Sequence, residues 1–378
     1  MLRQRLADTI NRALDAGELA GCNLEIIKDG RSLINISAGY ADIENSKKVS
    51  YDSIFRLYSQ TKPVTAAAAA LLVERGLLDV GAWVSDYLPG FNNQKVLRSD
   101  GSLASPVRPA SVGDLLSMTA GLCYPGGSGA EKYTARLFDE NQKQIDAGGG
   151  MGTVEFMNRL GGLPLAFDPG SEYKYSTCAD VLGAIVEIVS GVPFGEFLKQ
   201  EFFEPLGMKD TGFYLPQEKL SRLVTAYMRS ESGLKPYSVK HLCVGDYTKP
   251  PRFESGGAGL VSTLGDYARF ATMLINGGEY EGKRYLSRNT VAWLTKPQLT
   301  GLLEGTGYSY GKLMRVCVYP GRVNGLALEG EYGWDGWLGT YFINFPNEKM
   351  TFLFNQNTKD TGTAPLTRKL RNIVIASL

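Results

Sequence analysis

Apolar side chains recur at every fourth position at the start of the chain: Leu2, Leu6, Ile10 and Leu14. This periodicity predicts an amphipathic helix that packs against the rest of the fold. Two apolar-rich runs follow, Cys22–Ile27 and Ser32–Ala38, and the residues between them include Asp29-Gly30. An Asp-Gly pair between two such runs is typical of a tight hairpin. We therefore expect two antiparallel strands after the first helix.

The middle of the chain has mainly helical patterns, separated by connections rich in glycine and proline. The expected helices are Thr61–Arg75, Ser111–Met118, Val154–Leu160, Ala179–Ser190 and Phe194–Phe203. One connection, Tyr124–Gly152, is unusually long, and we expect it to be a mobile flap.

Strand-like sequence returns towards the C-terminus. Ser255–Leu260 predicts a turn, and the capping-box pattern of Thr263 and Asp266 predicts a helix that runs to about Asn276. Aromatic and β-branched residues then form three runs typical of strands: Tyr308–Val318, Thr340–Phe345 and Met350–Asn355. Pro346–Lys349 predicts the turn between the last two, and the apolar spacing of Pro365–Ser377 predicts a terminal helix.

Strands at both ends of the chain and helices between them predict an α+β fold of a single domain, residues 1–378. In this prediction the N- and C-terminal segments share one antiparallel sheet flanked by helices, which forms a sheet lobe of about 1–58 and 254–378. Residues 59–253 form a mainly helical lobe. The crevice between the lobes is where we expect the functional site.

Composition narrows the function classes. The 378 residues carry 40 Lys and Arg against 39 Asp and Glu, and neither sign forms a long block, so we expect no nucleic-acid or membrane partner. No secretory signal and no apolar run long enough to cross a bilayer is apparent. The five cysteines are odd in number and scattered, which favours a reduced, cytoplasmic setting over a disulfide framework or zinc site. We expect no metal and no cofactor.

The scarcity of histidine is the sharpest constraint on the chemistry. His241 is the only histidine, so a mechanism that needs a histidine base must use that residue. Gly307-Tyr308-Ser309-Tyr310-Gly311 matches the Gly-x-Ser-x-Gly nucleophile pattern of α/β-hydrolases. In that fold the histidine follows the serine, whereas His241 precedes Ser309, and no helix begins at this serine. We therefore reject this interpretation.

Without histidine, a serine can be activated by a lysine whose charge is suppressed by burial, and Ser-x-x-Lys is the local signature. The chain holds four such pairs: Ser59/Lys62, Ser171/Lys174, Ser232/Lys235 and Ser309/Lys312. Only Ser59 stands at the start of a helix that is apolar nearly all round and therefore buried. One helical turn separates Ser59 from Lys62, so both side chains point the same way, near the helix N-terminus. The alternative role for Ser59 is simple helix capping.

Two segments resemble motifs of one enzyme superfamily. Phe55–Thr65 resembles the first motif of class C β-lactamases and related esterases, within the serine β-lactamase and penicillin-binding-protein superfamily. Asp168–Thr177 resembles the second, Tyr-x-Asn, with Tyr175 at the tyrosine position. Thr177 replaces the asparagine; it makes fewer hydrogen bonds and reaches less far, which disfavours recognition of an acylamino side chain.

Gly333–Thr340 resembles the third motif in its esterase-like form, a strand that lines the cleft. Trp334 takes the place of a cation, Asp335 lies beside it, and Gly336 lets a substrate approach the backbone. The resemblance implies that the N–H groups of Ser59 and Trp337 form the oxyanion hole. Ordinary sheet packing is the alternative role for the two tryptophans.

The resemblance extends over nearly the whole chain and implies a β-lactamase/transpeptidase-like fold and a serine hydrolase that acts through an acyl-enzyme. Ser59 would be the nucleophile and Lys62 and Tyr175 the proton carriers. Trp334, Asp335, Gly336 and Thr177 would contact a small ester or amide substrate. Because Asp335 repels a carboxylate, we expect neutral esters to be preferred over β-lactams.

Other activities stay open at this point: β-lactamase, D-amino-acid amidase or peptidase, and acyltransferase. A non-catalytic sensor that binds an acyl compound is a further alternative, and the oligomeric state is open as well.

Overall fold

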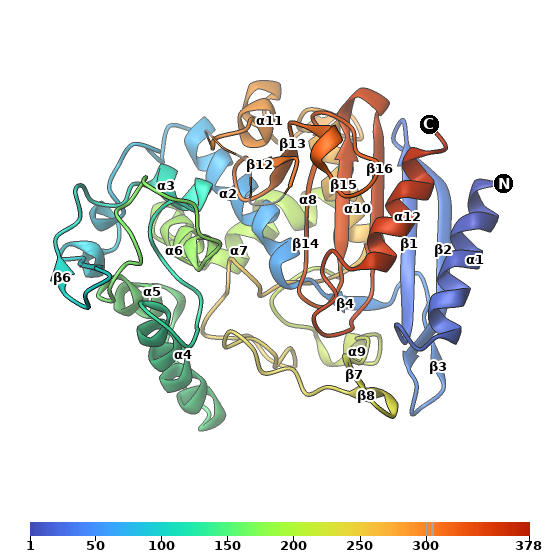
Figure 1. Ribbon diagram of the computed structural model, residues 1–378, viewed down its shortest axis with the longest axis horizontal. Coiled ribbons are helices and arrows are strands. Elements are labelled where there is room, and N and C mark those ends of the chain that lie inside the picture. Colours follow the sequence, from blue (N-terminus) through green and yellow to red (C-terminus); the bar gives the residue numbers. More distant parts are fainter. Residues whose placement is uncertain (300, 302, 304–305) are drawn as a thin grey trace.

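The centre of the molecule is an eight-stranded antiparallel sheet, seen in a computed structural model that describes residues 1–378 except 300, 302 and 304–305 (Figure 1). Its strand order is β12-β13-β14-β15-β16-β1-β2-β3. The N-terminal strands are β1 (Gly21–Lys28), β2 (Arg31–Asp42) and β3 (Lys47–Lys48). The C-terminal strands are β12 (Tyr308–Tyr310), β13 (Arg315–Cys317), β14 (Tyr332–Asp335), β15 (Tyr341–Phe345) and β16 (Met350–Asn355).

The two ends of the chain meet in this sheet, because β1 pairs with β16 over Asn23–Lys28. The expected hairpin joins β1 to β2, and Asp29 and Gly30 have φ values of 49° and 74°, as its tight turn requires. The expectation of an α+β fold, in which the N- and C-terminal segments share one antiparallel sheet, is confirmed.

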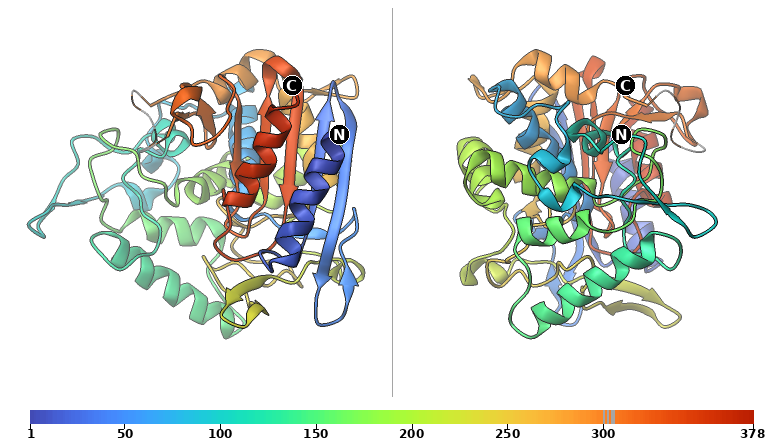
Figure 2. Two further views of the ribbon diagram at one scale, coloured as in Figure 1. Left: turned by 45° about the vertical axis from the view of Figure 1, so that its right-hand side comes forward. Right: turned by 90° about the vertical axis from the view of Figure 1, so that its left-hand side faces the viewer.

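Helices cover both faces of the sheet. The first and last helices, α1 (Leu2–Asp15) and α12 (Pro365–Ile375), lie side by side on one face (Figure 2). They bury a separate apolar cluster that includes Leu6, Ile10 and Leu370. On the opposite face, α10 (Leu264–Ile275) packs against β16, β1 and β15.

Most of the remaining helices lie beside the sheet, whereas α9 lies near the β7–β8 ribbon and α11 above β12 and β13 (Figure 1). Their bounds are α2 (Lys62–Glu74), α3 (Val112–Ser117), α4 (Glu131–Asp146), α5 (Thr153–Gly161), α6 (Cys178–Ser190), α7 (Phe194–Leu198), α8 (Glu204–Leu206), α9 (Gln217–Leu220) and α11 (Arg288–Thr295). Short two-stranded ribbons complete the fold: β4 (Ile54–Arg56) with β9 (Val261–Thr263), β5 (Val96–Leu97) with β6 (Leu103–Ala104), β7 (Tyr227–Ser230) with β8 (Gly233–Pro236), and β10 (Glu279–Tyr280) with β11 (Lys283–Arg284). Within the described chain, no single helix is long and apolar enough to cross a membrane, although the bent pair Cys178–Ser190 and Phe194–Leu206 meets the length and composition test together.

Two expectations about elements were wrong. The connection 124–152, expected as a long mobile flap between helices, contains a helix of its own, because the 16-residue α4 occupies most of it. Its buried stripe consists of Thr134, Leu137, Phe138 and Asn141, and two polar members conceal the apolar period. The single strand expected over Tyr308–Val318 is instead a hairpin of β12 and β13.

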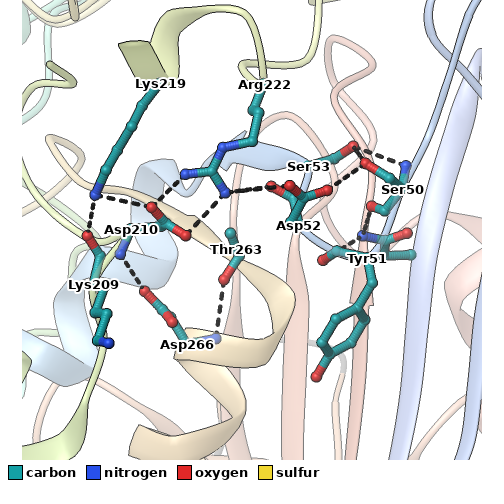
Figure 3. Close-up of polar contacts among 11 residues, drawn as sticks. Ser50, Tyr51, Asp52, Ser53, Lys209, Asp210, Lys219, Arg222, Thr263 and Asp266 are labelled. Carbon is teal, nitrogen blue, oxygen red and sulfur yellow. Dashed lines mark hydrogen bonds and ion pairs between the residues drawn. The ribbon is translucent and has the colours of Figure 1, made fainter. Parts of the chain in front are cut away.

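A polar network fixes the entry to β4, the strand that leads to the segment carrying Ser59 and Lys62 (Figure 3). Arg222 donates to both carboxylate oxygens of Asp210 and to the carbonyl of Asp52, just before β4. Asp266 accepts from the backbone N–H of Asp210, while its own N–H donates to the Thr263 hydroxyl that caps α10. The segment 209–222, the β4–β9 ribbon and α10 are thereby held together.

Candidate active site

Ser59 lies where the chain turns from β4 into helix α2. A short 3-10 helix, Tyr58–Thr61, carries it, and Lys62 is the first residue of α2. Tyr58 has a φ of 46°, a left-handed conformation that sharpens the turn and is uncommon for a residue with a side chain. Ser59 is partly exposed, whereas Lys62 is fully buried. The serine is thus accessible to a ligand while the lysine is shielded from water.

Three oxygen atoms surround the Lys62 ammonium nitrogen. Lys62 Nζ lies 3.1 Å from Ser59 Oγ, 2.8 Å from the Tyr124 hydroxyl and 2.8 Å from the carbonyl oxygen of Gly257. The carbonyl can only accept, so one N–H of the lysine must point there. A neutral amine has two N–H groups and one lone pair. If Tyr124 accepts the second N–H, the lone pair faces the hydroxyl of Ser59.

Burial decides the charge of this lysine. Loss of hydration lowers the pKa of Lys62 to about 7, although the carboxylates of Asp180 and Asp335 oppose the shift. Asp180 is itself buried, and it accepts from the Ser255 hydroxyl at 2.5 Å and from the Gly257 N–H at 2.9 Å. Asp180 therefore holds the segment whose carbonyl binds Lys62.

Tyr175 completes the cluster. Its ring centroid is 4.7 Å from Lys62 Nζ, and its hydroxyl accepts a hydrogen bond of 3.1 Å from the Trp334 indole. Burial raises the pKa of Tyr175 well above its ordinary value, while the neighbouring Ser59 hydroxyl and Trp334 indole oppose the shift. The phenol is consequently protonated at neutral pH. The structure brings Ser59, Lys62 and Tyr175 together from segments far apart in the sequence.

The turn from β14 into β15 lies directly against the backbone that precedes Ser59. Thr340 donates to the carbonyl of Leu57 at 3.0 Å, and the rings of Tyr58 and Trp337 are 5.1 Å apart. Among the hydrogen bonds of the described residues, the backbone N–H groups of Ser59 and Trp337 have no acceptor. Two unoccupied donors at adjoining turns are what an oxyanion hole requires.

The structure gives the four expected substrate contacts different surroundings. Trp334 is in contact with Tyr175. Thr177, in contrast, is fully buried and donates to the carbonyl of Cys123 at 3.3 Å, so its hydroxyl does not face a ligand. Gly336 is needed for a different reason than expected: a Cβ there would lie 2.1 Å from the Leu57 carbonyl oxygen, so the close approach is within the protein.

The argument that Asp335 repels anions was wrong. Asp335 forms an ion pair with Arg315, whose side chain is only 12% exposed. The negative charge is therefore compensated locally, and a buried cation is present beside the third motif. The two residues come from neighbouring strands, because Arg315 of β13 lies opposite Gly333 of β14, the strand that ends at Asp335.

The rejected serine motifs lie elsewhere. Ser309 is buried within β12 rather than at a strand-to-helix turn. Lys174 pairs with Glu131 at 2.8 Å instead of with Ser171, and Ser232 is exposed beside the β7–β8 ribbon. His241 stacks on Trp337, with ring centroids 4.3 Å apart. The histidine therefore contributes packing beside the site.

All five cysteines are free thiols. Four of them, Cys22, Cys123, Cys178 and Cys317, are buried, so solvent does not readily reach their sulfur atoms. Cys178 follows the second motif but is completely buried beside the Ser176 hydroxyl, and burial raises its pKa to about 12. A thiol of this kind is a packing residue rather than a nucleophile.

A pocket of about 650 Å³ lies between the end of α4 and the segment 238–253. Neither Ser59 nor Tyr175 is among the described residues that line it. This pocket is distinct from the serine cluster.

Two residues of the cluster escaped the sequence analysis. Tyr124 is 62 residues from Lys62, and nothing in its local sequence marks it. Asp180 carries a usable signal: it is an acidic residue in the first turn of α6, whose other residues as far as Val186 are apolar and buried. A charge in such a place requires a partner inside the fold.

The molecule has an antiparallel sheet with helices on both faces, and a Ser-x-x-Lys serine stands at the start of a buried helix. This is the architecture of serine acyl-transfer enzymes of the penicillin-recognising type. Residues 6–375 match the family described as Beta-lactamase. The chain belongs to this family and is a serine hydrolase.

Individual relatives agree with this assignment. The chain is 29% identical to Esterase EstB of Burkholderia gladioli, over 99% of this chain and 95% of that protein. The structure of EstCE1, described as a hydrolase with promiscuous acyltransferase activity, superimposes with a TM-score of 0.84 at 26% identity, covering 99% of this chain and 98% of that one. Simvastatin synthase from Aspergillus terreus shares the fold, with a TM-score of 0.81 at 20% identity over 100% and 98% of the two chains.

Proposed function

We propose that this enzyme hydrolyses carboxylic esters through an acyl-enzyme formed on Ser59. The observation that carries the proposal is the buried amine of Lys62, 3.1 Å from the serine hydroxyl and with a pKa of about 7. Near neutral pH a large fraction of this amine is unprotonated and can accept the serine proton.

In the proposed reaction, Ser59 Oγ attacks the ester carbonyl while its proton passes to Lys62. The N–H groups of Ser59 and Trp337 stabilise the oxyanion. The C–O bond to the alcohol then breaks, and the departing oxygen takes a proton. Water repeats the sequence on the acyl-enzyme and releases the carboxylic acid.

Tyr175 serves as the proton relay rather than the initial base. Burial keeps its phenol protonated, so it has a proton to give to the leaving oxygen. It recovers that proton from Lys62, which lies beside its ring. In this proposed order Lys62 acts first, as the base, and Tyr175 acts second, as the acid.

The preference for esters over β-lactams rests on the relatives. EstB is named an esterase and EstCE1 a hydrolase with promiscuous acyltransferase activity, so ester cleavage and acyl transfer are the chemistry that their names support. Comparison of kcat/KM on p-nitrophenyl butyrate and on a cephalosporin tests this part; a much higher efficiency on the cephalosporin would contradict it. The cytoplasmic location stays a prediction.

The nucleophile itself is tested by intact-protein mass spectrometry after exposure to a fluorophosphonate. We expect one adduct at Ser59, which is lost in Ser59→Ala and retained in Ser309→Ala, the matched control in the rejected motif. Labelling that survives Ser59→Ala would refute the site. A correctly folded protein that neither takes up label nor cleaves esters would be the non-catalytic sensor.

A further inference from the structure

The turn that joins β14 to β15 carries the N–H group of Trp337, and its own hydrogen bonds set the direction of that group. The N–H of Gly336 donates to the carbonyl of Thr340 at 2.7 Å, and the N–H of Gly339 donates to the carbonyl of Gly336 at 2.8 Å. In the planar trans peptide between Gly336 and Trp337, the carbonyl and the N–H point in opposite directions. Fixing the Gly336 carbonyl therefore also fixes the direction of the Trp337 N–H.

A second segment, residues 358–361 shortly after β16, holds the same turn. The N–H of Thr358 donates to the carbonyl of Leu338 at 2.8 Å, and the N–H of Thr361 donates to the carbonyl of Trp337 at 3.2 Å. The Thr361 hydroxyl closes the segment on itself by donating to the Thr358 carbonyl at 2.5 Å. The carbonyls of both residues in the middle of the turn are thus bound by one short segment.

Asp360 links this segment to the side chain of Trp337. One of its carboxylate oxygens accepts from the Trp337 indole N–H at 2.6 Å. Asp360 has a φ of 59°, a left-handed conformation in which aspartate is more common than most residues. Its side chain is 67% exposed. Asp360 therefore anchors the indole from the surface of the molecule rather than from within the serine cluster.

The other contacts of the indole lead to the nucleophile. The Trp337 ring is 5.1 Å from the ring of Tyr58, the residue before Ser59, and 4.3 Å from the ring of His241. The Trp337 side chain therefore connects Tyr58 to Asp360. Because the indole and the N–H of the oxyanion hole belong to one residue, loss of an anchor on the indole lets that N–H move relative to Ser59.

We propose that Asp360 is a positioning residue for the oxyanion hole, because its hydrogen bond to the indole holds Trp337 where the backbone N–H meets the oxyanion. Asp360 acts through Trp337 rather than on the substrate. The acceptor is charged, which makes the bond stronger than a hydrogen bond between neutral groups. This inference rests on the proposed ester hydrolysis and adds to it a residue that lies outside the three sequence motifs.

The kinetic test uses Asp360→Gly and p-nitrophenyl butyrate. Glycine removes the acceptor and adopts a positive φ without strain, so the backbone of the segment is kept. A weakened oxyanion contact acts on the transition state, so we expect kcat and kcat/KM to fall together by about tenfold, with KM within about twofold of the wild-type value. A loss of stability alone would leave the KM and the kcat of the folded protein unchanged.

Two further variants identify the bond as the cause, and a third is the matched control. Asp360→Asn keeps a carbonyl oxygen that can accept from the indole, and it should restore most of the lost kcat. Trp337→Phe removes the donor of the same bond, so adding Asp360→Gly to it should cause no further loss of kcat. Asp29 is also an exposed aspartate with a positive φ, 49°, but it lies in the turn between β1 and β2. Asp29→Gly should leave kcat and KM unchanged.

Nuclear magnetic resonance measures the bond without catalysis. The indole N–H resonance of Trp337 is identified by its absence in Trp337→Phe. In Asp360→Gly this N–H should exchange with water faster than in the wild type, and in Asp29→Gly it should not. Unchanged exchange in Asp360→Gly would show that the carboxylate does not hold the indole, which would overturn the proposal.

The kinetic outcomes separate this proposal from the proposed function. Full kcat in a folded Asp360→Gly variant would overturn the positioning role while leaving ester hydrolysis intact. A change in KM alone would also overturn it, because it would indicate a contact with the substrate. If Asp360→Gly does not fold, Trp337→Phe decides, since it removes the same bond from the other side. A wild-type enzyme that cleaves no ester would refute the proposed function and this role with it.

Discussion

Lys62 shows how burial converts an ordinary side chain into a base. A lysine in water is protonated at neutral pH and has no lone pair to offer. Here α2 places the amine in the core, and among the described residues three oxygens take the place of its water. The fold accepts the unfavourable burial because Gly257 and Tyr124 take up the N–H groups. The burial that lowers the pKa of Lys62 is therefore the same burial that places its amine beside Ser59.

The pH dependence of ester hydrolysis follows from this charge. Lys62 must be neutral to accept the serine proton, and its pKa is about 7. We expect kcat/KM to rise with pH, with half of the limiting value near pH 7, and to fall about tenfold per pH unit well below that point. Initial rates on p-nitrophenyl butyrate between pH 5 and 9, corrected for spontaneous hydrolysis, measure the profile. A flat profile across pH 7 would contradict a lysine base.

Asp180→Asn tests the electrostatic part separately. The asparagine oxygen can still accept from Ser255 and Gly257, but the negative charge that favours protonated Lys62 is gone. The pKa of Lys62 should fall further, so the acidic limb of the profile should move to lower pH. Circular dichroism and thermal unfolding would verify that the variant is folded. A limb that stays in place would mean that Asp180 acts through hydrogen bonds alone.

At the level of single residues, the sequence predicted the site residues that belong to local motifs. It missed the residues that other segments of the chain bring to the site. Ser59 and Lys62 are one helical turn apart, so local periodicity alone brings them together. Tyr124 and Arg315 reach their partners through tertiary packing, which no local pattern encodes. The ion pair of Arg315 is also why the charge argument about Asp335 was wrong.

At the level of elements, the proposed oxyanion hole depends on how closely β14 approaches the start of α2. Gly336 allows this approach, because a Cβ would stand 2.1 Å from the Leu57 carbonyl oxygen. Gly336→Ala must push the two elements apart. We expect a loss of about 1–3 kcal/mol of stability from the steric overlap, and a fall in kcat of about a hundredfold as the Trp337 N–H moves away.

Gly321→Ala is the control for that substitution, because an added Cβ there meets no atom within 4 Å. Urea unfolding and ester kinetics on the two variants separate stability from catalysis. If Gly336→Ala keeps full kcat despite lower stability, the Trp337 N–H does not contribute to the oxyanion hole.

Sequence periodicity succeeded for the elements that bury a continuous apolar face. α1, α6 and the hairpin of β1 and β2 fall in this class, and their ends lie within a few residues of expectation. It failed for α4, whose buried face is half polar. It also failed for the β12–β13 hairpin, where the residue with a φ of 55° is Leu313 rather than the glycine of the same turn, Gly311. Sequence patterns therefore predict helices and strands that bury an apolar face, and turns that carry the usual turn residues.

At the scale of the whole molecule, the sheet unites the two ends of the chain and supports one wall of the site. β1 pairs with β16, and α1 packs against α12, so the terminal segments depend on each other for burial. The sequence indicated that the two ends of the chain share a sheet, because strand patterns occur at both ends and a strand needs a neighbouring strand to pair with. It did not reveal how the last helix is fastened to the sheet, because that contact is between charges.

Arg371 of α12 forms that fastening with Glu331, which is fully buried just before β14. Glu331 also accepts from the Tyr308 hydroxyl at 2.5 Å and from the Leu328 N–H at 2.9 Å. Arg371→Met leaves a buried carboxylate without its cation, and we expect a loss of about 3–5 kcal/mol in the free energy of unfolding.

Adding Glu331→Gln to Arg371→Met removes the uncompensated charge while keeping an acceptor for Tyr308, so most of the lost stability should return. Urea unfolding of the two single variants and the double variant, treated as a double-mutant cycle, measures the coupling. If the losses of the two single variants simply add, the pair does not stabilise the junction. Strong coupling would show that the helix which closes the chain holds the strand of the third motif in place, and thereby the wall that faces Ser59.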